Sequence, residues 1–130
     1  MKRSILTAAA GATLLAATPA FATSTIHCTM PGRAGVELYL SVGNGPPPEG
    51  GLTQVRIVEG RRETVTGYDR GGPRLERPHV DPRTLRFEVT LGGQRLARLD
   101  ARTGRGGAYL GSLLLRGRAG PVRCLWDEDE

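Results

Sequence analysis

The positions of the two cysteines limit most strongly what this chain can fold into. Cys28 and Cys124 are the only cysteines in 130 residues, and they lie near opposite ends of the segment 23–130. Each shares one face of a short alternating pattern, so the first and last strands both present a cysteine on their apolar side. A disulfide requires Cα atoms within about 7 Å of each other. We therefore predict a Cys28–Cys124 disulfide, with the terminal strands either adjacent or facing each other across the core.

The first 22 residues have the three-part pattern of a secretory signal peptide. Lys2 and Arg3 give a basic start, residues 5–17 are apolar, and Ala20-Phe21-Ala22 is typical of a cleavage site. The apolar stretch is shorter than the roughly 20 residues that span a bilayer. We therefore predict a bacterial Sec-type signal over residues 1–22.

Residues 23–130 fit a single β domain that ends in a short acidic tail, residues 127–130. After cleavage we expect no transmembrane segment and a location in the periplasm or outside the cell, where disulfides form. The segment holds 18 glycines and 8 prolines but only five aromatic residues, so its core must be modest. A disulfide often compensates for a small core in exported domains.

Alternating apolar and polar residues between Gly/Pro turns predict an all-β fold. We expect a small antiparallel β-sandwich or partly open barrel of about seven to eight strands, with the termini clamped by the disulfide. Val36–Val42 forms one strand, and Leu52–Val58 and Arg62–Thr66 form a hairpin. The apolar run Leu113–Leu115 indicates a central strand, and Gly117–Pro121 should form the last turn.

The hairpin around Gly93 allows its register to be predicted. A two-residue turn would place Phe87 opposite Arg98, an apolar side chain against a charged one. An odd-length connection centred on Gly93 instead pairs Phe87 with Leu99, Glu88 with Arg98 and Arg86 with Asp100, so that both faces become consistent. We therefore expect the odd register, with a bulge.

Arginine supplies all the basic charge of the predicted mature segment. Residues 23–130 contain 16 arginines and no lysine, and their net charge is +3. Guanidinium groups bind carboxylates and phosphates bidentately. The arginines are dispersed rather than clustered, however, which makes nucleic acid an unlikely partner. Coding bias in a GC-rich genome is an alternative explanation for their number.

The irregular segment 67–82 carries the partner-binding candidates Arg70, Arg74 and Arg77. A loop of this length without an element of its own is either mobile or functional. Its arginines could reach acidic groups on a protein, a glycan or a lipid head group. The sequence therefore favours a small exported, non-catalytic binding domain for an envelope or extracellular partner.

We predict no enzyme activity, cofactor or metal site. His27 adjoins a predicted disulfide cysteine in a strand, where its side chain should point outward, and His79 lies in the long loop. The chain has no CxxC or HExxH spacing, and none of its serines lies on a nucleophile elbow.

Two alternatives to a general binding domain stay open. Gly107-Ala108-Tyr109 and Gly117-Arg118-Ala119 have a limited similarity to the C-terminal segment of small periplasmic lysozyme inhibitors. The serine-rich stretch and the lysine expected there are missing, and no family is assigned on these residues. The similarity implies a periplasmic inhibitor of a cell-wall hydrolase as the first alternative. A structural envelope protein is the second.

Overall fold

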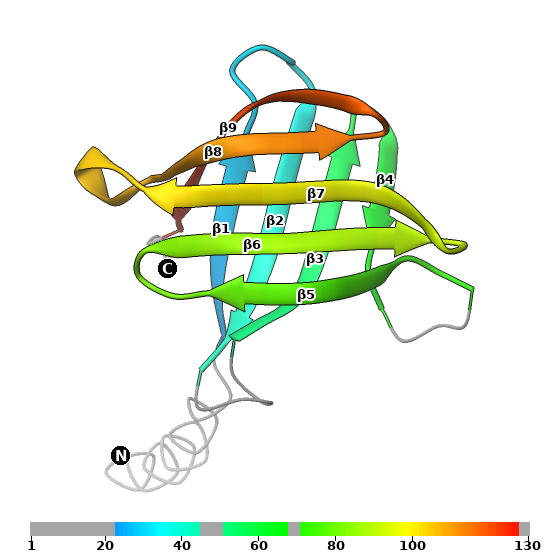
Figure 1. The fold of residues 1–130 in the computed structure, drawn as a ribbon, viewed down its shortest axis with the longest axis horizontal. Helices are drawn as coiled ribbons and strands as arrows, with labels where there is room; N and C mark the ends of the chain where they lie inside the picture. The colour runs from blue at the N-terminus through cyan, green and yellow to red at the C-terminus, as the bar shows by residue number, and fades with distance from the viewer. Residues whose placement is uncertain (1–22, 45–50, 68–70, 128–130) are drawn as a thin grey trace, which may run out of the picture.

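The computed structural model describes residues 23–44, 51–67 and 71–127, and the predicted signal peptide lies outside these ranges. The described part is built from strands that follow one another along the chain (Figure 1). Their bounds are β1 Thr23–Thr29, β2 Val36–Gly43, β3 Gly51–Glu59, β4 Arg62–Val65, β5 Arg74–Val80, β6 Thr84–Leu91, β7 Gln94–Thr103, β8 Tyr109–Leu115 and β9 Arg118–Trp126, with a short 3₁₀ turn η2 at Arg105–Gly107. Within these ranges no helix is long and apolar enough to cross a membrane.

The strands form a single antiparallel sheet in the order β4-β3-β2-β1-β9-β8-β7-β6-β5. The chain thus meanders outward from the centre through β1–β4 and returns to the centre through β5–β9. The prediction of an all-β antiparallel fold is confirmed. The described chain has nine strands rather than seven or eight, and they form one continuous curled half-barrel sheet, so a sandwich of two sheets is not confirmed.

The curl of the sheet creates the core. In Figure 1 strands β5–β8 cross in front of β1–β4, and one hydrophobic cluster contains side chains from both halves. Leu38 and Ile57 come from one half, whereas Phe87, Leu99 and Leu113 come from the other, and all five are at most 1 % exposed. The same curl brings β3 into contact with β5, although these strands lie near opposite ends of the strand order.

The predicted disulfide is present and joins the first strand to the last. Cys28 and Cys124 are paired residues of neighbouring strands β1 and β9, their Cα atoms are 4.0 Å apart, and both side chains are fully buried. The terminal strands are therefore neighbours in the middle of the sheet. A disulfide and the lack of a membrane-spanning helix in the described ranges are compatible with a periplasmic or extracellular location.

The predicted register of the β6–β7 hairpin is confirmed, with Phe87 opposite Leu99 and Glu88 opposite Arg98. Its origin differs from the expected odd-length loop. The turn has only two residues, Gly92 and Gly93, whose positive φ angles of 63° and 81° suit the tight turn of a hairpin. A bulge where the pairing shifts after Val89 supplies the odd residue instead.

The expectation of an irregular segment over residues 67–82 is wrong, because β5 lies within it. A bulge in β5 occupies Arg77 and Pro78, between the pairs Glu76–Glu88 and His79–Arg86. The extra residue disrupts the period-two alternation that marks a strand in sequence. Proline is tolerated here because β5 is the last strand in the order of the sheet, and no described strand forms a ladder with its outer edge.

The last turn is also shorter than expected. It consists of Arg116 and Gly117, and β9 begins at Arg118 instead of after Pro121. Pro121 is accepted within the strand because β1 pairs with β9 only from Arg123 onward. The missing amide of the proline therefore costs no hydrogen bond to β1.

Candidate functional site

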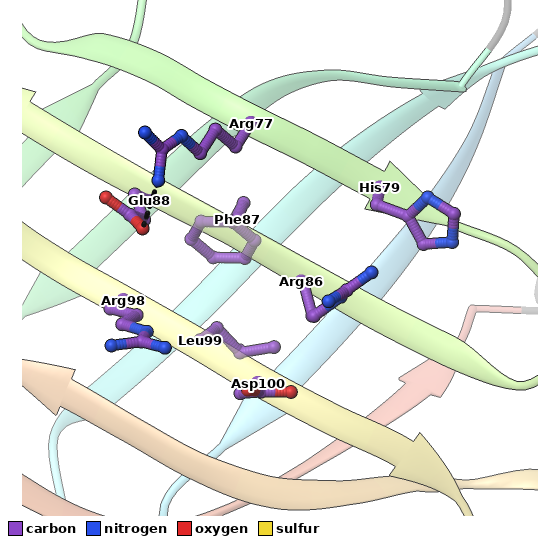
Figure 2. Close-up of a pocket in the computed structure, with 8 residues that line it drawn as sticks. All are labelled: Arg77, His79, Arg86, Phe87, Glu88, Arg98, Leu99 and Asp100. Carbon is purple, nitrogen blue, oxygen red and sulfur yellow. Dashed lines mark ion pairs between the residues drawn. The ribbon is translucent and has the colours of Figure 1, made fainter.

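The outer surface of β5, β6 and β7 is hollowed into a shallow depression of about 340 Å³, which we call the arginine basin (Figure 2). Alternation explains its composition. On β6 and β7 every second side chain is buried in the core, so the intervening polar side chains face outward. The charged and titratable residues that line the basin are Arg77, His79, Arg86, Glu88, Arg98 and Asp100.

Glu88 is the acidic centre of the basin. Its carboxylate is only 18 % exposed, and it lies 3.9 Å from Nη1 of Arg77 and 3.5 Å from Nε of Arg95. Arg77 reaches it from the bulge of β5, where its backbone has a φ of 49°, an unusual value for a residue with a side chain. The single negative charge of Glu88 is thus shared between two arginines.

Arg86 and Arg98 are less well neutralised. In register Arg86 faces His79 and Asp100, and Arg98 faces Glu88. No ion pair within 4.0 Å joins either guanidinium group to a carboxylate in the described residues. The cross-strand pairs expected from the sequence are therefore opposite in register, but they do not form close salt bridges. The basin keeps two exposed cations on adjacent strands.

The structure separates the three arginines that the sequence singled out. Arg77 lines the basin, but Arg74 lines a different hollow of about 530 Å³ near Gln54 and Thr66, where β5 approaches β3. Arg70 lies outside the described residues. The structure therefore places one of the three at the basin and does not bring Arg74 and Arg77 into one site.

The sequence interpretation missed Arg86 and Arg98 as site residues. Their outward positions follow from the same alternation that identified Phe87 and Leu99 as core residues. The sequence predicts cross-strand charge pairs of Arg86 with Asp100 and of Arg98 with Glu88, and such pairs would leave neither arginine available to a partner. The useful signal was the excess of arginine over acidic residues on the polar face of two paired strands.

Asp81 fixes the turn at the end of the basin. Its Oδ1 atom accepts hydrogen bonds from the backbone N–H groups of Arg83 and Thr84, each at 2.8 Å, and its Oδ2 atom lies 2.8 Å from Nε2 of His79. The bond from the Arg83 amide, followed by those from His79 and Thr84, lowers the pKa of the Asp81 carboxyl group. Asp81 therefore holds both the turn and the imidazole of His79.

A second cluster lies on the outer surface of β1–β3, and its polar side chains bond to one another. As expected, His27 faces outward. Its ring stacks on Tyr39 at 4.8 Å, and its Nε2 atom is 2.9 Å from Glu37. The Tyr39 hydroxyl donates a 2.6 Å bond to Glu37, which lowers the pKa of that carboxyl group and raises the pKa of the tyrosine. Arg56 lies over the Tyr39 ring and pairs with Glu63. With its polar groups paired in this way, the cluster is a weaker candidate site than the basin.

The described ranges 23–44, 51–67 and 71–127 contain no group of three or more His, Cys, Asp or Glu side chains that could hold a metal ion. No protein-family model, curated protein or solved structure matches this chain. The functional interpretation of the arginine basin therefore rests on its own residues.

Proposed function

We propose that this chain is a small exported, non-catalytic binding domain that holds an anionic group of an envelope or extracellular partner in the arginine basin. The observation that carries the proposal is the pair Arg86 and Arg98, which have no carboxylate within 4.0 Å among the described residues. Exposed arginines without partners raise the local positive potential and attract anions.

The spacing of these two arginines suits one shared anion. They lie on the outer face at diagonal positions of paired strands, where Cα atoms are roughly 7–8 Å apart. Two planar guanidinium groups at this separation can converge on a carboxylate or phosphate, and Arg77 at the rim can add a third. Phe87 and Leu99 are packed beneath the basin in the core, which holds their strands rigidly in place.

The lining also supports binding rather than catalysis. Among the described residues it contains guanidinium groups, one imidazole and two carboxylates, but no hydroxyl or thiol side chain of the kind that serine, threonine and cysteine enzymes use as a nucleophile. Arg77, one of the three contact residues predicted from the sequence, lines the basin and is therefore a contact residue in this proposal.

In the test, the immobilised protein captures its partner from an envelope extract, and two charge-matched variants are compared with the unaltered protein. The variant Arg86→Gln/Arg98→Gln removes two charges from the basin. The control Arg118→Gln/Arg123→Gln removes two exposed arginines from β9, outside the basin. We expect the basin variant to lose the partner and the control to retain it, and wild-type capture to weaken with added salt, because exposed charges are screened over about 8 Å at physiological ionic strength.

The identity of the captured partner then separates the alternatives. A cell-wall hydrolase whose activity falls on binding would support the inhibitor function, and an acidic glycan, lipid or protein would support the general binding function. Equal loss of capture in both variants would show that only net charge matters. Retention by the basin variant would overturn the site assignment.

A further inference from the structure

A further depression lies at one open end of the curled sheet, and its chemistry differs from that of the basin. Its volume is about 320 Å³, near the lower limit for small-molecule sites. We call it the end pocket. The residues that line it are Val42, Gly51, Val80, Asp81, Pro82, Tyr109 and Trp126. It combines elements from both halves of the sheet, as the mouth of a small β-barrel does.

A chain of hydrogen bonds holds the wall of the end pocket. The Tyr109 hydroxyl donates to the backbone carbonyl of Asp81 at 2.7 Å. Burial raises the pKa of this tyrosine, and the neighbouring Trp126 side chain acts in the opposite direction. The turn is held from β7 as well, because the Thr103 amide donates to the Arg83 carbonyl at 2.9 Å. The pocket is therefore formed before any ligand arrives, which reduces the ordering cost of binding.

Trp126 is the accessible aromatic surface of this pocket. Tyr109 is 1 % exposed and forms its base, whereas Trp126 is 37 % exposed at the end of β9. A large aromatic side chain that is this exposed in a hollow is a common feature of recognition sites. The electron-rich face of an indole attracts organic cations.

The charges around the end pocket also favour a cation. Among the described residues, Asp81 is the only charged residue in the lining and no arginine lines it, although arginine is the most frequent charged residue of the chain. The Asp81 carboxylate accepts three hydrogen bonds, from Arg83, Thr84 and His79, which leaves about one of its four lone-pair sites.

We infer that the end pocket binds a small organic cation with an apolar body, such as a quaternary or alkylated ammonium group, with Trp126 against the cation and Asp81 as its counter-charge. Val42, Val80 and Pro82 take the apolar part of the ligand. This site is separate from the arginine basin and does not depend on the function proposed for it.

The test uses choline as the probe and the purified, oxidised protein. Trp126 is the only tryptophan of the chain, so its fluorescence reports binding directly. Two controls carry a tert-butyl group, which has the shape of the trimethylammonium group without its positive charge. The first is the neutral alcohol in which tert-butyl replaces trimethylammonium, and the second is the carboxylate anion of tert-butylacetic acid (tert-butylacetate). We expect saturable binding of choline, with chemical-shift changes in the methyl groups of Val42 and Val80. The neutral isostere should bind roughly 2- to 30-fold more weakly, the range set by cation–π energies, and tert-butylacetate should not bind.

Variants on the same strand then locate the site. Trp126→Leu should abolish choline binding as measured by calorimetry, whereas Leu125→Ala, the adjacent residue on the opposite face of β9, should not. The isostere comparison is made on the unaltered protein, so the inference is tested even if the Trp126 variant does not fold. Equal affinity for the isostere, or no saturable shifts at Val42 and Val80, would overturn the inference.

Discussion

Breaking the disulfide is expected to remove a large part of the stability of this protein, because the bond lies where the two halves of the sheet meet. Strands β1 and β9 are the middle of the strand order, and their ladder joins only four residue pairs. The adjacent β1–β2 and β8–β9 ladders each join seven. The Cys28–Cys124 bond therefore reinforces the shortest ladder at the centre of the sheet.

The size of the effect follows from the loop that the bond closes. Cys28 and Cys124 are 96 residues apart in sequence. A loop of this length corresponds to about 4.7 kcal/mol in the chain-entropy treatment of disulfides, although measured effects are often smaller. Total stabilities of small domains are about 5–15 kcal/mol. Loss of the bond would therefore leave a marginally stable fold.

Urea unfolding followed by circular dichroism measures this loss. With a urea slope of about 1–3 kcal/mol/M, the full effect of about 4.7 kcal/mol would lower the unfolding midpoint by roughly 1.6–4.7 M. The unaltered protein with reductant is compared with the double variant Cys28→Ala/Cys124→Ala, which also loses the buried sulfur atoms and should be less stable still. If reduction lowers the free energy of unfolding by less than about 1 kcal/mol, the loop argument is refuted for this protein.

Three further predictions concern the core, the β5–β6 turn and the ion pair between the end of β3 and the β8–β9 turn. Phe87→Ala should lower the free energy of unfolding by about 3–5 kcal/mol, because the side chain is 1 % exposed in the shared core; denaturant unfolding checks this, and a loss below about 1 kcal/mol would contradict it. The lowered pKa of Asp81 means that its carboxylate stabilises the folded state above the ordinary value of 3.8, and that this contribution disappears as pH falls through the lower folded-state pKa. Asp81→Asn should therefore destabilise the protein at neutral pH and much less in acid, as measured by thermal unfolding at several pH values; a pH-independent difference would refute the charge argument. Arg116 contacts both carboxylate oxygens of Glu59 at 3.1 Å, so a double-mutant cycle with Arg116→Gln and Glu59→Gln should give a coupling energy of about 0.2–1 kcal/mol, which high salt should reduce.

Local patterns in the sequence predicted the disulfide and most strands because each depends on alternation. Cys28 and Cys124 share faces with apolar neighbours, and burial forces those faces inward. The β6–β7 register was predictable for the same reason, since a slip of one residue would send Phe87 to the solvent. The sequence could not show that a bulge rather than the turn supplies the odd residue. An odd-length turn and a bulge both give the same cross-strand pairs from Leu85–Ala101 to Val89–Ala97.

The site was harder to predict because it depends on a strand that breaks the alternation rule. The bulge at Arg77 and Pro78 conceals β5 in the sequence, and without β5 there is no third strand to form the basin. The end pocket could not be predicted either, because its residues come from segments that are far apart in the sequence. Asp81 and Trp126, for example, are 45 positions apart in the sequence but line one pocket.

The β5–β6 turn connects the two candidate sites, and this decides which substitutions can distinguish them. His79 lines the arginine basin, Asp81 lines the end pocket, and their side chains meet at 2.8 Å. A substitution of either residue alters both surfaces, so a loss of binding in such a variant would not identify the site. Arg98 lines the basin and not the end pocket, whereas Trp126 lines the end pocket and not the basin. Substitutions at these two positions therefore separate anion binding at the basin from cation binding at the end pocket.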